Sequence, residues 1–480
     1  MRHSRVLVVA GLSLLFAGVL AGACGGSDDV APSGSDWPTF GHDLQHTRSN
    51  PTENTIGVDN VADLELVWEH RGVEVSSTPS IVDGVVYFAD WSGLLYARKA
   101  IDGSEVWTSD NGGIGITASL AVGPDTIFIG DRQAVLHSID RDTGEFRWSA
   151  QLDAHPSANL TGSPIPVDDI VIVGVSSGEL GSEKEDYTFR GSIVAVGQSD
   201  GVERWRVYVS QDDETSGAGV SVWSTPSIDI ERQLMFIGTG QSYEQPAGPM
   251  SDSLIAIDYV TGEVAWVRQY TENDVYRLFM PIPKGPDADI GAAPNLFRIG
   301  GRDVVGVGDK GGVYAVFDRA TGEPVWRTKL GPGSHLGGIM APAAYAEGTL
   351  FVATNLWPSG FDSSIAFVPD FDLPENTSEL IALDATDGSE LWRTPVSSPT
   401  IGGAMHANGV VYSGHTLGMA QAFDASDGRV LWQDRVGDTL ASGQVVSDGM
   451  LFVTHGFSFI GITGAGSGFT GGLRAYALPE

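Results

Sequence analysis

The chain has 480 residues, and 63 of them are glycine, a larger share than the roughly 7% of an average protein. Only 18% of the residues are charged. Both values favour tight turns and a large sheet-rich core. The 61 acidic and 27 basic side chains give a net charge of −34, which excludes nucleic acid and anionic lipid surfaces as binding partners. The single cysteine excludes a disulfide framework and a cysteine-rich metal site.

Residues 1–23 are predicted to be a lipoprotein-type signal peptide. Two arginines give a positive start, and residues 6–20 form an apolar run that is short for a membrane span. The following Ala-Gly-Ala-Cys resembles a lipobox, with Cys24 as the expected lipidation site; ordinary secretion is the alternative. Residues 24–36 are polar and rich in glycine and serine, typical of a flexible tether. We therefore expect an extracytoplasmic protein, in the periplasm or cell envelope, that contacts a membrane only through its lipid anchor.

A repeat runs through the remainder of the chain. In each unit one strand ends near an aspartate, a Thr-Gly or Asp-Gly turn follows, and a second strand carries a tryptophan four positions after the glycine. Another strand pair lies upstream of each unit, so that four strands and one tryptophan make a propeller blade, with the tryptophan packing between blades. The seven pairs are Gly103/Trp107, Gly144/Trp148, Gly201/Trp205, Gly262/Trp266, Gly322/Trp326, Gly388/Trp392 and Gly428/Trp432.

The two ends of the chain supply an eighth blade. Residues 64–68 are typical of an outer strand with its tryptophan, and residues 472–478 are typical of a third strand that lacks the turn and tryptophan. Pairing them closes the ring and removes two exposed edges. We predict an all-β fold, an eight-bladed β-propeller over residues 37–480, with its long loops in residues 149–391, where function is expected.

Several catalytic motifs are missing from the sequence. It contains no CxxCH haem motif, no HExxH, no GxSxG elbow and no phosphate-binding glycine loop before a lysine. The ten histidines are scattered without metal-ligand spacing. A redox cofactor would therefore have to come from outside and be held without covalent attachment.

The blade signature A-x-D-x-x-T-G-x-x-x-W resembles that of the pyrroloquinoline quinone (PQQ) dehydrogenases, although scaffold lipoproteins of outer-membrane assembly share it. More specific are the segments LTGSPIPVDDIVIVGVSSGELG (160–181), VWSTPSIDIERQLMFIGTGQ (222–241) and PDADIGAAP (286–294). WPTFGHDLQHTRSNP (37–51) and EDYTFRGSIVAV (185–196) most resemble polyvinyl-alcohol dehydrogenases. The resemblance runs from about Trp37 to the C-terminus and implies PQQ and Ca²⁺ as cofactors.

The resemblance also implies the cofactor-binding residues. Trp223 lies outside the Gly-x-x-x-Trp repeat, and a flat indole beneath a planar quinone explains it. Lys310 would polarise the quinone oxygens and stabilise the negative charge that develops there. The remaining residues expected to hold PQQ are Thr161, Ser176, Ser177 and Gly178.

The resemblance makes Glu179 a Ca²⁺ ligand, together with Gln241 and Asp289, because a hard cation prefers several oxygen ligands. Gln241 departs from the asparagine that is usual in the family, so its longer side chain would have to reach the metal.

Oxidation of an alcohol also needs a carboxylate that takes the hydroxyl proton. We expect Asp289 to be this general base, with Asp287 as its rival, because an Asp-x-Asp spacing on a strand puts both side chains on one face. An alternative alignment places Asp274 there.

The sequence departs from the family in three further features. The adjacent cysteines of many relatives are missing, and Ser76 replaces a glutamate of the first blade. We expect no fused haem domain of the kind that some relatives use to receive electrons. The leading hypothesis is a PQQ- and Ca²⁺-dependent dehydrogenase of secondary or polymeric alcohols that passes electrons to an external cytochrome c. The main alternative is a non-catalytic propeller lipoprotein that acts as an envelope scaffold; a sugar dehydrogenase with the same cofactor is a third interpretation.

Overall fold

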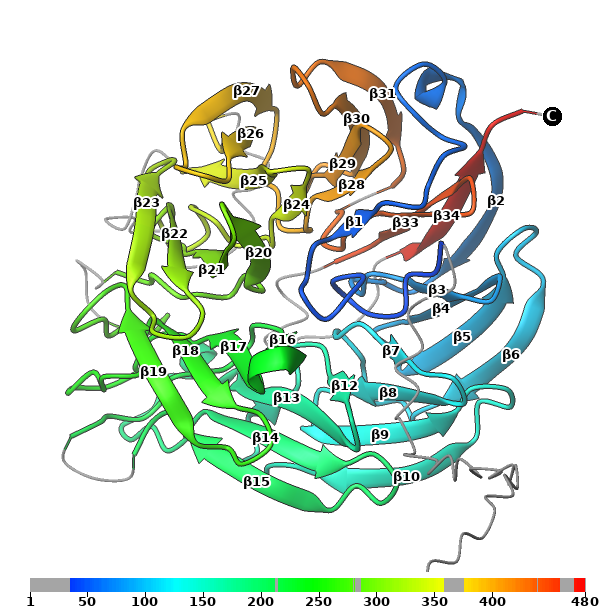
Figure 1. Ribbon diagram of the computed structural model, residues 1–480. Coiled ribbons are helices and arrows are strands. Elements are labelled where there is room, and N and C mark those ends of the chain that lie inside the picture. Colours follow the sequence, from blue (N-terminus) through cyan, green and yellow to red (C-terminus); the bar gives the residue numbers. More distant parts are fainter. Residues whose placement is uncertain are drawn as a thin grey trace, which may run out of the picture. The chain divides into compact units, whose positions relative to one another are not determined.

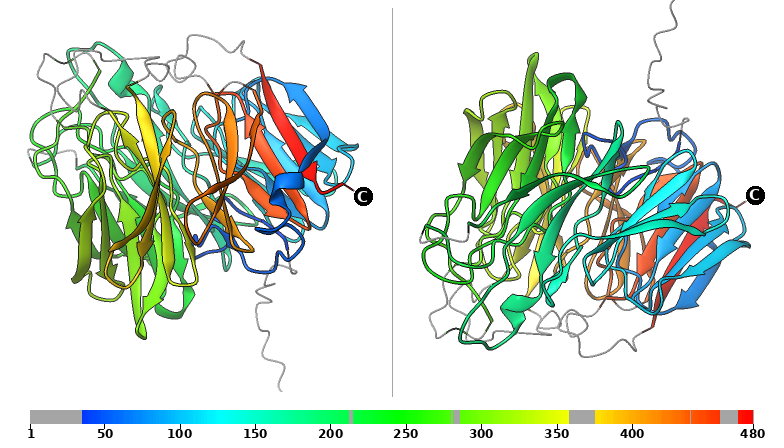
Figure 2. Two further views of the ribbon diagram at one scale, coloured as in Figure 1. Left: turned by 90° about the horizontal axis from the view of Figure 1, so that it is seen from above. Right: turned by 90° about the horizontal axis from the view of Figure 1, so that it is seen from below.

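Eight sheets, each built on four antiparallel strands, follow one another around a ring (Figure 1). The computed structural model describes residues 35–211, 215–278, 280, 286–357, 375–437, 439–457 and 470–479. The ring and its eight blades confirm the predicted fold. The two side views show that the sheets stand steeply around the axis (Figure 2).

The blades follow the chain in order. The first blade consists of β3 (Ser80–Val82), β4 (Val85–Ala89), β5 (Leu94–Lys99) and β6 (Glu105–Asp110), and the second of β7 (Ala121–Val122), β8 (Thr126–Gly130), β9 (Val135–Asp140) and β10 (Phe146–Gln151). The third consists of β12 (Ile165–Val167), β13 (Ile170–Ser177), β14 (Ser192–Gly197) and β15 (Glu203–Tyr208), with β11 (Ala158–Asn159) pairing β13. The fourth consists of β16 (Ser227–Asp229), β17 (Leu234–Gly238), β18 (Ser253–Asp258) and β19 (Val264–Gln269). The fifth blade consists of β20 (Asn295–Ile299), β21 (Arg302–Gly308), β22 (Val313–Asp318) and β23 (Pro324–Lys329). The sixth consists of β24 (Ala344–Ala346), β25 (Thr349–Leu356), β26 (Thr377–Asp384) and β27 (Glu390–Val396). The seventh consists of β28 (Met405–Ala407), β29 (Val410–Gly414), β30 (Met419–Asp424) and β31 (Val430–Arg435), with β1 (Ser49–Asn50) pairing β28. Short 3-10 helices are η1 (Val61–Asp63), η2 (Glu179–Gly181) and η3 (Ile230–Arg232).

The eighth blade joins the two ends of the chain, as predicted. It consists of β32 (Val445–Ser447), β33 (Met450–His455), β34 (Gly471–Ala477) and β2 (Glu65–Gly72). β2 pairs antiparallel with β34 from Glu65 opposite Ala477 to Gly72 opposite Gly471. The ring is therefore closed by backbone hydrogen bonds, which pair β34 on both sides and leave β2 as the end strand of the blade.

The repeated tryptophan and glycine belong to one contact between neighbouring blades. Trp107 Nε1 donates to the carbonyl of Arg141 in the next blade over 2.8 Å. Gly144 of that blade has a φ of 74°, and a Cβ on it would lie 2.7 Å from Cε3 of Trp107. The glycine is therefore required twice, for its positive φ and for the close approach of the indole.

The segment that follows the predicted tether lies against the inner strands of the ring (dark blue in Figure 1). Pro38 O accepts from Val122 N, Leu44 O from Ile228 N, and Thr47 O from Tyr345 N, at 2.7–2.8 Å. Arg48 in the same segment is fully buried. Its guanidinium donates to the carbonyls of Ala404 over 2.7 Å and Phe40 over 2.6 Å. These contacts explain why residues 37–51 form a distinctive motif: they bind several blades at once.

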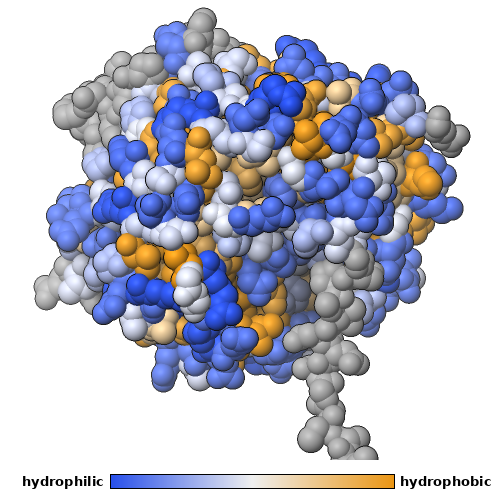
Figure 3. Space-filling view, turned by 45° about the horizontal axis from the view of Figure 1, so that its top comes forward, coloured by the Kyte–Doolittle hydropathy of each residue, from blue (hydrophilic) through white to orange (hydrophobic). Residues whose placement is uncertain are grey.

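The predicted signal peptide, Cys24 and nearly all of the predicted tether lie outside the described residues. Within the part of the chain that is described, no helix has the length and apolar character needed to cross a membrane. On the face in Figure 3, hydrophilic side chains cover most of the surface and apolar ones are scattered among them. The large apolar residues lie mainly in the contacts between sheets.

Candidate functional site

A cavity of about 410 Å³ contains most of the residues singled out from the sequence. Loops from many blades line it, from Phe40 near the start of the chain to Phe457 near its end. The predicted site residues among its lining are Thr161, Ser176, Ser177, Gly178, Trp223, Gln241, Asp287, Asp289 and Lys310. Glu179 and Asp274 do not line it. The ring thus brings together side chains that are far apart in the sequence.

Trp223, Asp289 and Lys310 form one connected group in the cavity wall. Trp223 Nε1 donates to Asp289 Oδ2 over 3.1 Å, and Lys310 Nζ donates to the same oxygen over 3.0 Å. The Lys310 ammonium also lies over the indole, 5.6 Å from the ring centroid. An indole face, a carboxylate and a cation are therefore held side by side.

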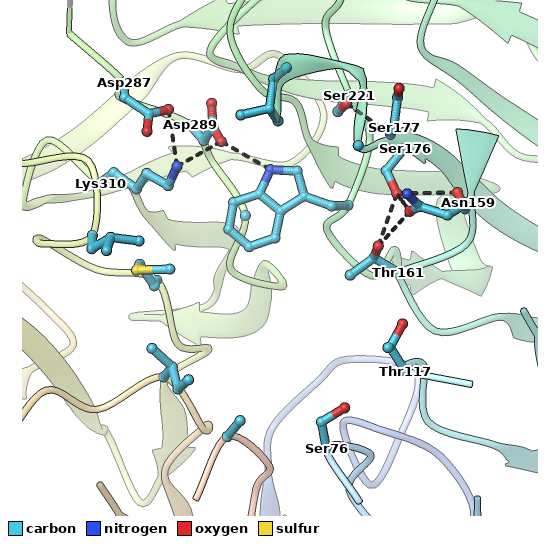
Figure 4. A pocket seen from close by; sticks show the side chains of 18 of the residues that line it. Ser76, Thr117, Asn159, Thr161, Ser176, Ser177, Ser221, Asp287, Asp289 and Lys310 are labelled. Carbon is cyan, nitrogen blue, oxygen red and sulfur yellow. Dashed lines mark hydrogen bonds and ion pairs between the residues drawn. The ribbon is translucent and has the colours of Figure 1, made fainter. Parts of the chain in front are cut away.

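The two carboxylates of the Asp-x-Asp motif meet at Lys310 (Figure 4). Lys310 Nζ donates to Asp287 Oδ1 over 3.0 Å as well as to Asp289. Burial alone would lower the pKa of Lys310, but the two carboxylates reverse this effect and raise it above its usual value. Lys310 is therefore a permanent cation. The prediction that this motif lies on a strand is wrong, because the backbone N–H of Ala288 donates to the Asp274 carboxylate instead of to a neighbouring strand.

Hydroxyl and amide groups gather on another side of the cavity (Figure 4). Thr161 Oγ1 donates to Asn159 Oδ1 over 2.7 Å, and Ser176 Oγ lies 3.1 Å from Thr161 Oγ1. Ser177 has a second function, since its Oγ accepts from the backbone N–H of Glu179 over 2.9 Å and shapes the turn into η2. This cluster supplies hydrogen-bonding groups that can rotate toward a polar ligand.

Glu179 is fully buried, and its carboxylate binds groups that do not line the cavity. Lys184 Nζ donates to Oε1 over 2.9 Å, and Phe189 N donates to Oε2 over 2.9 Å. Thr188 N lies within 3.4 Å of both oxygens, and His155 Nε2 lies 3.4 Å from Oε1. Burial would raise the pKa of Glu179, but Lys184 and these N–H groups hold it below its usual value. Glu179 is therefore an ionised carboxylate in an ion pair.

Gln241 and Asp289 are in direct contact. Gln241 N donates to Asp289 Oδ1 over 2.9 Å, and the oxygen of the Gln241 amide faces the Asp289 carboxylate. Two facing oxygens need either a rotated amide that donates or a cation between them. This donor pair fits a hard cation, whereas Glu179 as placed does not contribute to it. No group of three or more His, Cys, Asp or Glu side chains suited to a metal occurs among the described residues.

Asp274 lies behind the segment of Asp287 and Asp289 rather than in the cavity wall. Its Oδ2 accepts from Ala288 N over 2.8 Å, and burial, with a contribution from Asp287 and Asp289, raises its pKa to about 8. Asp252 is fully buried, and chiefly for that reason its pKa lies well above the usual value, with Asp274 adding to the rise. Asp274 therefore supports the segment that carries the two aspartates and does not face a ligand.

Sequence reasoning missed several residues of the cavity wall. Arg132 lines the cavity with its guanidinium carbon 5.2 Å from the ring centroid of Trp91. His335 lines it with Nδ1 3.9 Å from Asp287 Oδ2. Each belongs to a different loop and has no repeat or motif around it, so only the closure of the ring shows that they share a site.

The fold is an eight-bladed propeller, and its cavity is lined by aromatic, hydroxyl and charged side chains. A family model described as "Glucose/ethanol/alcohol dehydrogenase, beta-propeller domain" matches residues 155–332. A second model, described as "Outer membrane protein assembly factor BamB", matches residues 309–461. The resemblance to PQQ-type dehydrogenases is confirmed, because residues 155–332 match the model of this β-propeller domain and similar sequences include polyvinylalcohol and quinohemoprotein alcohol dehydrogenases.

The chain is similar in sequence to known alcohol dehydrogenases. It is 28% identical over 433 residues to a polyvinylalcohol dehydrogenase of Pseudomonas sp, covering 81% of this chain and 65% of that protein. It is 25% identical to the quinohemoprotein alcohol dehydrogenase of Comamonas testosteroni, covering 76% of this chain and 53% of that protein. The chain thus spans about two thirds or less of the length of these relatives.

Solved structures share the fold. The crystal structure of the Comamonas testosteroni quinohemoprotein alcohol dehydrogenase superimposes with a TM-score of 0.75 at 21% identity, covering 93% of this chain and 82% of that one. A europium-containing methanol dehydrogenase gives a TM-score of 0.73 at 18% identity, covering 93% of this chain and 98% of that one. BamB from Moraxella catarrhalis gives 0.55 at 15% identity, covering 86% of this chain and 98% of that one.

Proposed function

We propose that this chain is an extracytoplasmic, PQQ-dependent dehydrogenase that oxidises secondary or polymeric alcohols, as the names of its polyvinylalcohol dehydrogenase relatives suggest. The observation that carries the proposal is the group formed by Trp223, Asp289 and Lys310 in one cavity wall. A scaffold needs blades that pack, but it has no need for a carboxylate and an ammonium beside an indole in its central cavity.

The donor set of the cavity fits PQQ, a planar ring system with carboxylate and carbonyl oxygens. The indole of Trp223 offers a flat surface. Lys310 and Arg132 supply positive charge, and Thr161 and Ser176 supply hydroxyl groups. When bound, the quinone would accept the hydride from the carbinol carbon.

The protein's own residues handle the proton. In this proposal Asp289 takes the hydroxyl proton of the alcohol at a carboxylate oxygen, and Asp287 is the rival base. Lys310 donates to both carboxylates, and the donors Trp223 Nε1 and Gln241 N fix the plane of the Asp289 carboxylate. Loss of activity in Asp289→Asn with retention in Asp287→Asn would assign the base, and the reverse result would exchange the roles.

Calcium is the cation we propose for the site, with Gln241 and Asp289 as ligands. Their side chains are in direct contact, and the amide oxygen of Gln241 meets the Asp289 carboxylate in one of its two orientations. Glu179, the third ligand that the family resemblance implies, would have to leave Lys184 to join them.

The proposed electron acceptor is an external cytochrome c. A chain with a net charge of −34 would attract a basic partner over several ångströms and would do so less at high salt. An electron-transfer rate to a basic cytochrome c that is insensitive to ionic strength would contradict electrostatic steering. Membrane attachment, if Cys24 is lipidated, would keep the enzyme in the cell envelope.

The second candidate function is a non-catalytic scaffold lipoprotein, favoured by the match of residues 309–461 to the BamB model. Purified full-length protein reconstituted with PQQ and Ca²⁺ separates the two. The dehydrogenase should change the quinone absorbance and reduce a dye with a secondary alcohol or polyvinyl alcohol as substrate. Asp289→Asn should keep the absorbance change and lose dye reduction, whereas the exposed control Asp186→Asn should keep both. Failure to bind PQQ at micromolar concentration would favour the scaffold.

A further inference from the structure

The carboxylate of Glu179 forms an ion pair with the ammonium group of Lys184. Lys184 Nζ lies 2.9 Å from Oε1, and the side chain of Glu179 has no exposed surface, while that of Lys184 is 35% exposed. The ammonium therefore reaches from solvent into a buried carboxylate. An ionised carboxylate in a buried position needs such a partner, because an uncompensated buried charge is strongly destabilising.

The remaining contacts of Glu179 are supplied by the backbone of the same loop. Thr188 N and Phe189 N donate to the carboxylate, and His155 Nε2 approaches Oε1 to 3.4 Å. Lys184 and the two N–H donors all come from the ten residues that follow Glu179. The loop thus surrounds the carboxylate with donors that do not line the cavity.

Glu179 nevertheless directly follows a residue that lines the cavity. Gly178 lines the cavity wall, and so do Gln241 and Asp289, whose oxygens face one another. Tyr243 Oη connects the two regions, since it donates to Ser177 O and shares a 2.8 Å hydrogen bond with Ser221 Oγ. Burial raises the pKa of Tyr243, and the charges of Asp289 and Glu179 add to this rise, so both carboxylates lie near its hydroxyl group.

We infer that Lys184 and a divalent cation are alternative partners of Glu179, so that Lys184 is an internal competitor that weakens cation binding at the cavity. The inference rests on the proposed function only in taking Ca²⁺ as the cation. The apparent affinity for the cation is reduced by the fraction of molecules in which Glu179 is free of Lys184. Lys184 is thus a positioning residue that tunes metal affinity and does not itself touch substrate or cofactor.

The test is a calorimetric titration of Ca²⁺ alone into metal-free, full-length protein, without quinone or substrate. Lys184→Gln should tighten the Ca²⁺ dissociation constant by about tenfold or more, as expected when the competing state is populated at 90% or above. The control Lys99→Gln removes the same charge from an exposed strand end and should have much less effect. Glu179→Gln keeps an acceptor for Phe189 N but should weaken Ca²⁺ binding, and in that background Lys184→Gln should add nothing beyond the Lys99→Gln effect.

An unchanged Ca²⁺ affinity in Lys184→Gln, equal effects of Lys184→Gln and Lys99→Gln, or no Ca²⁺ binding by either the wild type or Lys184→Gln would overturn the inference. Thermal unfolding of each variant shows whether the ring is intact. Failure of the proposed function is a separate result, since PQQ binding and dye reduction by the wild-type protein report it. Calcium competition by Lys184 could hold in a protein that binds no quinone.

Discussion

Gly291 lies against the indole of Trp223 so closely that a Cβ on residue 291 would be 1.8 Å from Cη2 of the ring. The backbone of Gly291 has no positive φ, so the requirement for glycine is one of space. The glycine therefore leaves room for the indole in the cavity wall.

Gly291→Ala should displace the indole and weaken PQQ binding by about tenfold or more, because ring stacking depends on the position of the flat face. The measurement is quinone titration followed by absorbance, with thermal unfolding as a check on folding. Trp223→Phe in the Gly291→Ala background removes the part of the ring that the new methyl group meets, and it should restore part of the affinity. Quinone affinity equal to that of the wild type in Gly291→Ala would show that the indole does not form the binding surface.

Lys310 compensates two buried carboxylates, so its removal should be costly. Lys310→Met should lower the rate of alcohol oxidation by about 100-fold or more, since one cation both stabilises developing charge and holds the carboxylates of Asp287 and Asp289 in place through hydrogen bonds. Lys310→Arg should retain more activity than Lys310→Met, and the exposed control Lys329→Met should match the wild type. Steady-state kinetics with a secondary alcohol give the answer; a Lys310→Met enzyme with normal turnover would remove Lys310 from the mechanism.

The contact between neighbouring blades can be tested with two glycines of similar conformation. Gly103 has a φ of 69°, and a Cβ on it would lie 2.6 Å from the Trp68 ring, whereas Gly84 has a φ of 73° and nothing within 4 Å. Both changes to alanine carry the backbone strain of about 1 kcal/mol or more. Gly103→Ala should lower the free energy of unfolding by at least about 1 kcal/mol more than Gly84→Ala, because it also forces Trp68 out of place. Equal losses in chemical denaturation would mean that the indole contact contributes little to the docking of the eighth blade on the first.

The fold could be predicted because its information is local. A glycine and a tryptophan four residues apart mark each blade, and the partner of that glycine is the tryptophan of the preceding blade. The unfinished blade at each end of the sequence indicated ring closure, and the pairing of β2 with β34 confirms it. Short sequence patterns sufficed here because every blade repeats the same contact.

The site could be predicted only in part, because side-chain direction depends on neighbours that no short pattern specifies. Trp223 and Lys310 line the cavity as the resemblance implied, but Glu179 faces Lys184. Nothing in the spacing of these residues distinguishes a carboxylate directed at a metal from one directed at an ammonium five positions away. Arg132 and His335 could not be found for a related reason, since each reaches the cavity from a loop with no motif of its own.

The buried carboxyl group of Asp274 predicts how stability changes with pH. Its pKa rises from 3.8 to about 8 in the folded protein, mainly through burial, although the hydrogen bond from Ala288 N opposes the rise. Between these two values the folded protein keeps a proton that the unfolded chain releases. Raising the pH from about 4 to about 8 therefore favours the unfolded chain, by at most about 1.4 kcal/mol for each pH unit.

Asp274→Asn removes this titration and keeps an oxygen that can accept from Ala288 N. The variant should gain stability over the wild type as the pH rises, with little difference near pH 4 and the largest difference near pH 8. Denaturant unfolding at a series of pH values measures the gain, and the exposed control Asp186→Asn should follow the wild type across the range. A stability difference between Asp274→Asn and the wild type that is the same at pH 4 and pH 8 would show that Asp274 does not hold a proton in the folded protein. The neighbouring carboxylates of Asp252, Asp274, Asp287 and Asp289 would then need a second cation besides Lys310 for compensation.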